Sequence, residues 1–123
     1  MRRANKYGAI RTTLDGITFD SKGEAQRWAF LKMMERSGLI SGLRRQVPVE
    51  LHAPILGDRI GGGLVGKYVM DFAYFPKGST VETWEDFKSP ATVTALFSWK
   101  RKHIEIEYGK KLRVVRRPTD DVT

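Results

Sequence analysis

The sequence contains no cysteine, and its only histidines are His52 and His103. The lack of cysteine excludes disulfide bonds and thiolate zinc sites, and the two histidines have no metal-ligand spacing, so we expect them to be structural. No stretch approaches the ~20 apolar residues that a membrane-spanning helix needs. The basic start, MRRANKYGAI, is not followed by the apolar segment of a signal peptide. These absences predict a cytoplasmic protein with no membrane association.

Positive charge is what the sequence has in excess. It carries 22 Lys and Arg residues against 14 Asp and Glu, which gives a net charge of +8 and a pI near 10.0. A small domain this basic attracts polyanions, most often nucleic acid. The basic residues occur at the start, mid-chain and in the last quarter, which indicates several loci on one surface rather than one charged tail.

The length of 123 residues fits a single domain, 1–123, with 1–6 and 118–123 as flexible ends. Turn, cap and periodicity signals predict an α/β (α+β) fold with a central mixed sheet between two helices. The signals include the Asp15-Gly16 turn, a capping box from Ser21 to Glu24 and the helix-ending Gly38. The expected elements, in order, are a hairpin in 10–19, a helix over 22–37, a strand in 42–55 with Pro48 favouring an edge or bulge, a glycine-rich loop over 56–67, strands in 67–75 and 80–88, a helix over 91–102, and strands in 103–108 and 110–117. Trp28 and Trp99 are expected in the core, and burial is also the expectation for Tyr7 and Tyr68.

Ionisable residues interrupt two of these apolar strands. Strand periodicity places Trp84, Asp86 and Lys88 on one face, with Asp86 and Lys88 roughly 7 Å apart along the strand. In the preceding strand, Asp71 shares a face with Val69 and Ala73, opposite Tyr68, Met70, Phe72 and Tyr74. If the two strands pair, Asp71 approaches Asp86, and two carboxylates on an apolar sheet repel each other unless a cation joins them. Magnesium is the obvious candidate, because it takes oxygen ligands and is usually held by one or two carboxylates.

Two neighbours complete this candidate site. Lys88 could orient or deprotonate a nucleophile or neutralise developing charge, and Glu24 can reach the same place if its helix lies against the sheet. The spacing leaves simpler readings open. The acids and Lys88 could form a salt-bridge cluster, and Glu24 could be only the second half of the capping box.

Four motifs, FDSKGEA, LRRQ, YVMDFAY and EDFK, occur here in order. Together they resemble small phage- and prophage-encoded nucleases of the PD-(D/E)XK superfamily, a group long filed as a domain of unknown function. The resemblance implies a restriction-endonuclease-like fold and cleavage of DNA that depends on Mg²⁺ or Mn²⁺. It implies Asp71, Asp86 and the Phe87 carbonyl as metal ligands, Glu24 as a further ligand and Lys88 as the catalytic lysine. The sequence departs from the superfamily pattern where Met70 replaces a proline and where Ser89-Pro90 follows the lysine in place of a glycine.

The function expected from charge and resemblance together is a structure-selective DNA endonuclease, acting on junctions, branches or nicks in phage DNA replication, recombination or packaging. It would work in the cytoplasm of a phage-infected or lysogenic bacterium, alongside phage replication or packaging proteins, and a homodimer is expected for junction cleavage. Gln46 is a possible supporting residue. The expected DNA contacts are Arg44, Arg45, Lys67, Lys100, Arg101 and Lys102; the last three could instead favour a helix dipole. The alternatives are a catalytically silent DNA-binding accessory protein with a nuclease-like fold and a basic protein-interaction module.

Overall fold

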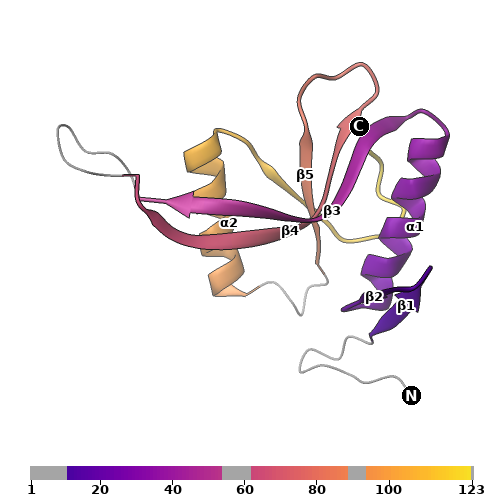
Figure 1. Ribbon diagram of the computed structural model, residues 1–123, viewed down its shortest axis with the longest axis horizontal. Helices are drawn as coiled ribbons and strands as arrows, with labels where there is room; N and C mark the ends of the chain where they lie inside the picture. Colours follow the sequence, from indigo (N-terminus) through magenta and orange to yellow (C-terminus); the bar gives the residue numbers. More distant parts are fainter. Residues whose placement is uncertain (1–10, 54–61, 89–93, 123) are drawn as a thin grey trace.

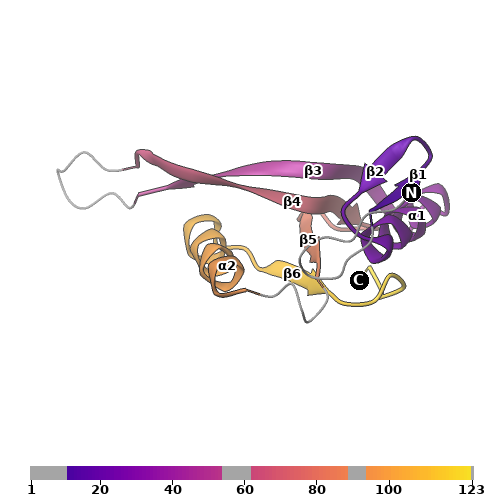
Figure 2. The same cartoon turned by 90° about the horizontal axis from the view of Figure 1, so that it is seen from below.

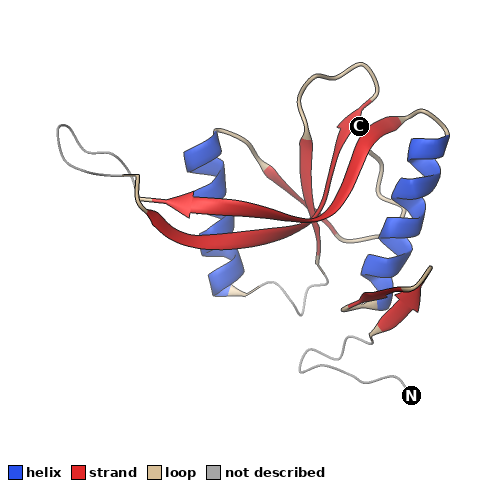
Figure 3. Ribbon diagram, in the orientation of Figure 1, coloured by secondary structure: helices blue, strands red, loops and turns tan. Residues whose placement is uncertain are grey.

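The computed structural model describes residues 11–53, 62–88 and 94–122, and it is a mixed α+β fold, as predicted (Figures 1 and 3). A four-stranded sheet has the order β3-β4-β5-β6, and β1 and β2 form a separate two-stranded sheet. The elements are β1 (Thr12–Leu14), β2 (Ile17–Phe19), α1 (Lys22–Arg36), β3 (Ile40–His52), β4 (Leu64–Pro76), β5 (Thr83–Phe87), α2 (Ala95–Tyr108) and β6 (Leu112–Val115). Neither of the described helices is long and apolar enough to cross a bilayer.

The main sheet is antiparallel from β3 to β5, and β6 joins β5 in parallel after the α2 crossover. β3 is the edge strand, which confirms the prediction from Pro48, because proline has no N–H to give to a second neighbour. Figure 2 shows the long ribbon of β3 and β4 extending over α2, while α1 lies near the other end of the ribbon.

Two apolar clusters cover the two faces of this sheet. The cluster next to α1, which we call the α1 cluster, contains Leu31, Ile40, Phe72, Tyr74 and Val122. The cluster next to α2, the α2 cluster, contains Val47, Val49, Leu51, Met70, Ala73, Phe97, Ile104 and Leu112. Along β5, Trp84 packs against the α2 cluster and Phe87 against the α1 cluster, so successive side chains alternate between the clusters as expected for a strand.

Strict alternation fails in β4. Tyr68 and Met70 pack with the α2 cluster, whereas Phe72 and Tyr74 belong to the α1 cluster, so these four side chains do not share one face as predicted. The change occurs around Asp71, next to the point where the pairing of β4 with β5 ends and where Gln46 of the neighbouring β3 has a positive φ of 53°. This is the region that holds the candidate site.

The largest error of the sequence-based prediction is the segment 103–108. Its alternating HIEIEY pattern predicted a strand, but it is the second half of α2, which runs over 95–108 rather than 91–102. Phe97 and Ile104, two helical turns apart, form the buried face, while Ile106 is exposed. The helix ends at Gly109, whose φ of 61° suits the left-handed cap. Residues 64–67, expected in the glycine-rich loop, begin β4, and 54–61 lie outside the described residues.

The polar C-terminal end also differs from expectation. Residues from 118 were predicted to be flexible, but Val122 is buried in the α1 cluster, and Arg27 donates hydrogen bonds to the carbonyls of Pro118 and Asp120. The end packs because a buried arginine needs acceptors for its remaining N–H groups. Trp99, expected in the core, is 62 % exposed, whereas Trp28 stacks on Phe72. Tyr7 and residues 1–6 lie outside the described residues.

Candidate functional site

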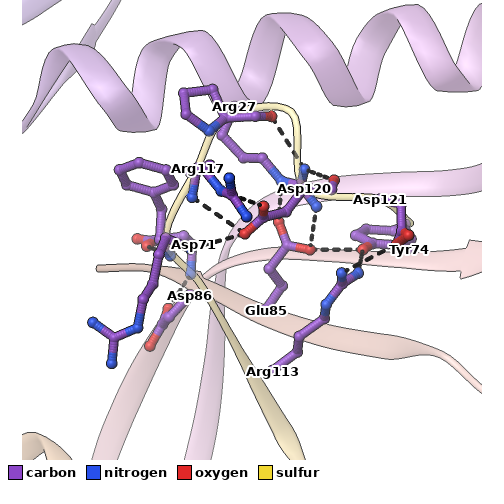
Figure 4. Close-up of polar contacts among 12 residues, drawn as sticks. Arg27, Asp71, Tyr74, Glu85, Asp86, Arg113, Arg117, Asp120 and Asp121 are labelled. Carbon is purple, nitrogen blue, oxygen red and sulfur yellow. Dashed lines mark hydrogen bonds and ion pairs between the residues drawn. The ribbon is translucent and has the colours of Figure 1, made fainter. Parts of the chain in front are cut away.

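The candidate site lies where β4 and β5 separate. Their ladder ends at the pair Phe72–Glu85, and beyond it two carboxylates replace backbone acceptors. The Asp71 backbone N–H donates to Asp86 Oδ1 at 2.8 Å, and the Phe87 backbone N–H donates to Asp71 Oδ2, also at 2.8 Å. Figure 4 shows Asp71 and Asp86 together between the diverging strands. This reciprocal arrangement fixes both carboxylates, so the predicted meeting of Asp71 and Asp86 is present.

Glu24 reaches the site from the first turn of α1. Ser21 caps the helix by accepting the Glu24 N–H at 3.1 Å, and a close packing contact brings the helix start onto the sheet. Gly23 makes this approach feasible, because a Cβ there would lie only 2.4 Å from Cε1 of Phe87. Within the described residues, the Glu24 carboxylate hydrogen-bonds to Gln46 Nε2, at 3.5 Å, and not to the backbone of its own cap. Glu24 is therefore more than the second half of a capping box.

Glu24 and Asp86 are buried and Asp71 is partly buried, and the pKa of each of the three carboxylates is raised. Burial raises the pKa of Asp71 well above its usual value, and the charges of Asp86 and Glu24 raise it further. The pKa of Glu24 is raised to about 7, first by burial and then by the charges of Asp20 and Asp86. Burial also raises the pKa of Asp86, against hydrogen bonds from Tyr68 and the Asp71 backbone. The ionised form of each carboxylate is therefore destabilised by loss of water and by the neighbouring negative charges.

Lys88 supplies a cation beside these acids. Its ammonium lies 4.8 Å from the centre of the Phe97 ring, and its charge lowers the pKa of all three carboxylates. Its backbone N–H donates to the Val115 carbonyl at 2.9 Å, which fixes the end of β5 against β6. Asp86 contacts Tyr68 and Lys88 contacts Phe97, both on the α2 side of the sheet, which agrees with the predicted common face.

A divalent cation fits the chemistry of this donor set. The carboxylates repel one another, and burial removes water from around their charges. A bound cation would offset both the repulsion and the unfavourable free energy of this desolvation. Among residues 11–53, 62–88 and 94–122, no group of three His, Cys, Asp or Glu side chains is arranged to hold a metal ion. Asp71 and Asp86 are the carboxylates closest to this role, and Mg²⁺ is commonly bound through one or two carboxylates with waters and phosphate oxygens completing its shell.

The other predicted residues divide into two groups. Arg45 lies at the site, with its guanidinium 4.9 Å from the Phe19 ring centre and its charge lowering the pKa of Glu24. Gln46 also lies there, through its contact with Glu24. Arg44 pairs instead with Glu82: its Nη2 donates to Oε1 at 3.0 Å and to Oε2 at 2.9 Å. The remaining predicted DNA contacts are Lys67, exposed on the β3–β4 ribbon, and Lys100, Arg101 and Lys102, which lie within α2.

Sequence reasoning did not assign Tyr68 to the site. Its hydroxyl donates to Asp86 Oδ2, and burial followed by the charge of Asp86 raises the pKa of Tyr68. Together with the Asp71 N–H, this bond occupies an acceptor position on each Asp86 oxygen and sets the carboxylate orientation. The only sequence signal was a tyrosine three residues before Asp71, and its meaning depends on the register of β4 against β5.

A buried ion pair behind the site was also not predicted. Arg27 and Glu85, both with fully buried side chains, pair through two N–H···O bonds of 2.7 and 2.9 Å (Figure 4). The Tyr74 hydroxyl donates to Glu85 at 2.6 Å, and Arg113 donates to Tyr74 at 3.3 Å. The network joins α1, β4, β5, β6 and the C-terminal segment, so it holds the helix carrying Glu24 against the strand carrying Asp86.

The chain belongs to a family described as a protein of unknown function (DUF1064), whose match covers residues 4–119. No curated protein and no solved structure shows significant similarity to it.

Proposed function

We propose that the protein is a divalent-metal-dependent DNA endonuclease that selects its substrate by DNA structure. The observation that supports this best is the group formed by the buried Glu24 and Asp86 and the partly buried Asp71, with raised pKa values and Lys88 beside them. Titratable groups perturbed by burial and by one another concentrate at functional sites. The net charge of +8 supplies the attraction for a polyanionic substrate.

In this proposal Asp71 and Asp86 would be the principal ligands of a Mg²⁺ or Mn²⁺ ion, with waters and phosphate oxygens completing its shell. The resemblance also implies the Phe87 carbonyl and Glu24 as ligands, but Glu24 would have to move closer, because no three-residue metal group occurs within the described residues. When bound, such an ion supplies positive charge at a phosphodiester and lowers the pKa of a coordinated water. The hydrogen bonds from the Asp71 and Phe87 N–H groups hold the two carboxylates in place. The Lys88 ammonium orients the attacking water or neutralises negative charge that develops on the phosphate. Arg45, beside Glu24, is the described arginine best placed to hold a neighbouring phosphate.

The mixed sheet with one helix against each face is the architecture that a likeness to PD-(D/E)XK nucleases implies. We therefore assign the protein to the restriction-endonuclease-like nucleases as part of the proposal. On the same reasoning it acts in phage DNA replication, recombination or packaging, in the host cytoplasm, and as a homodimer if it resolves junctions. Contacts from basic side chains to phosphates position a protein on DNA without reading base sequence, so the proposed recognition is through phosphates and DNA shape.

The second candidate is a DNA-binding accessory protein without catalytic activity. It is favoured by one observation: no three-residue metal group occurs within the described residues. Under this reading the acids are structural, and their hydrogen bonds to backbone N–H groups only close the gap between β4 and β5.

A cleavage panel separates these candidates. Four-way junctions, flaps, nicked circles and linear duplex are incubated with the protein in Mg²⁺, in Mn²⁺ or in EDTA. Asp71→Asn keeps an oxygen acceptor for the Phe87 N–H, and Lys88→Ala removes the ammonium; each is expected to lower the cleavage rate by at least about 100-fold while DNA binding persists. Lys77→Ala, the loss of an exposed lysine in the β4–β5 turn, is the matched control. If every DNA substrate stays intact in the lanes that contain Mg²⁺ or Mn²⁺, the proposal that the protein is a nuclease is excluded.

A further inference from the structure

Helix α2 is apolar on two opposite faces. Phe97 and Ile104 point into the α2 cluster, as expected for a helix packed on a sheet. Leu96, Trp99 and Ile106 lie on the outer side, where they are 62 %, 62 % and 84 % exposed. Trp99 and Ile106 are seven residues apart and so lie on one stripe of the helix. A tryptophan exposed to this degree at the centre of an apolar stripe marks an interaction surface.

The charges around Trp99 identify the kind of partner. Lys102, three residues after Trp99, lies near it on the same side of the helix, and Lys100 lies about 100° around the helix from it. Within the described residues neither lysine forms an ion pair. The acids of the same helix are already occupied: Glu105 pairs with Arg101 at 3.4 Å and accepts the Leu112 N–H at 3.1 Å. Glu107 likewise accepts bonds from the His52 N–H and lies within 2.7 and 3.1 Å of the His52 and His103 rings. The uncompensated charge next to Trp99 is therefore positive.

This distribution favours nucleic acid over a second copy of the chain. In a helix-to-helix dimer, the lysines of one copy would need the acids of the other, and those acids are engaged internally. A polyanion needs only the lysines. An exposed aromatic ring beside basic side chains is also the arrangement on which unpaired bases stack.

We propose that the outer face of α2 binds single-stranded DNA, with an unpaired base stacked on Trp99 and the adjacent phosphates neutralised by Lys100 and Lys102. This inference rests on the proposed function, and it restricts the substrate of the proposed nuclease to DNA that contains an unpaired strand. The same helix carries Phe97 under the Lys88 ammonium, at 4.8 Å. A strand on the outer face of α2 thus lies one helix diameter, about 10 Å, from the face that contacts the catalytic lysine.

Oligothymidylate, which forms no secondary structure, is the probe. Binding to the full chain in EDTA is followed by fluorescence anisotropy of a labelled oligonucleotide and by quenching of tryptophan emission. Trp99→Leu keeps an apolar side chain but removes the aromatic ring, and it is expected to weaken binding about 5- to 150-fold, the equivalent of roughly 1–3 kcal/mol per stacked base. Most of the quenching should disappear with it, because Trp28 is stacked inside the protein and Trp84 lies under Lys110. Val81→Ala, at a position 64 % exposed in the β4–β5 turn, is the control.

Each outcome is informative. Single-strand affinity that is unchanged in Trp99→Leu overturns the inference. The inference is also overturned if the wild-type protein is a dimer, Trp99→Leu makes it a monomer, and the affinity for single-stranded DNA does not change. The outer face of α2 would then be a contact between two copies of the chain. Trp99-dependent binding without metal-dependent cleavage supports the stacking surface and refutes the nuclease. Metal-dependent cleavage with affinity insensitive to Trp99 supports the nuclease and refutes the stacking surface.

Discussion

Gly23→Ala tests how the structure builds the site, because Gly23 is where α1 touches β5. A Cβ at this position would lie 2.4 and 2.6 Å from Cε1 and Cζ of Phe87, whereas ordinary contacts are 3.4–4 Å. Restoring normal contact needs a shift of about 1 Å in the helix start or the ring. Phe87 cannot simply move aside, because its ring packs against the α1 cluster and its N–H is bonded to Asp71.

Two opposing effects set the size of the change in stability. Alanine favours a helix over glycine by about 1 kcal/mol, somewhat less so close to a helix end. Overpacking a filled contact costs about 1–3 kcal/mol. We expect a net loss of about 1 kcal/mol in the free energy of unfolding. The effect on cleavage should be larger, since displacing Glu24 by about 1 Å from its partners can lower a rate about 100-fold.

Urea unfolding and the cleavage assay measure the two effects separately. Gly66→Ala is the matched control, because a Cβ on Gly66 would have no atom within 4 Å and this glycine has no left-handed φ, so the substitution should be neutral or stabilising. Combining Gly23→Ala with Phe87→Leu removes the two ring atoms that clash, and the pair should show a favourable coupling of about 1 kcal/mol in a double-mutant cycle. If Gly23→Ala is instead more stable than the wild type by the full helix-propensity gain, the approach of α1 to Phe87 is incorrect.

Four further outcomes follow from the same geometry. Because the pKa of Glu24 is raised from 4.5 to about 7, the folded state binds more protons than the unfolded chain between these values, so this group destabilises the metal-free protein as the pH rises through them. Glu24→Gln should remove that loss, of the order of 3 kcal/mol, in thermal melts in EDTA; equal pH slopes in both proteins would contradict it. Mg²⁺ should raise the melting temperature more at about pH 8 than at about pH 5, since protons compete for the carboxylates, and no metal-induced shift at either pH would argue against the site. Arg27→Met should cost about 3–5 kcal/mol in urea unfolding by leaving Glu85 buried and unpaired, and adding Glu85→Leu should recover much of it; no recovery would mean that the pair is not the cause. Val122→Ala should cost about 1–2 kcal/mol if the C-terminal segment packs in the α1 cluster, whereas Val81→Ala, at an exposed position, should stay within about 0.5 kcal/mol.

Turns and helix ends were predicted correctly from the sequence, because each is determined by a few residues next to one another in the chain. The Asp15-Gly16 turn, the Ser21 cap and the Gly38 helix end all lie where predicted, because each depends on the backbone preferences of adjacent residues. The prediction that Asp86 and Lys88 lie on one face of the strand agrees with their contacts for the same reason, because side-chain alternation is a property of adjacent residues. The strand predicted for HIEIEY was wrong because the exposed Ile106, two residues after the buried Ile104, produces the alternating apolar pattern of a strand within a helix. Only the docking of Phe97 and Ile104 against β3 and β6 separates the two possibilities.

The sequence by itself determined a basic, cysteine-free α+β domain with an acid on one strand and an acid and a lysine on the next. Tertiary structure alone decided that β4 and β5 separate at Asp71 and Asp86, and that α1 lies close enough to bring Glu24 to them. It also decided the pairing of Arg27 with Glu85, 58 residues apart in the chain. The physical reason is that burial and charge repulsion depend on which groups lose water together, and groups distant in the chain lose water together only when the sheet register and helix docking are set.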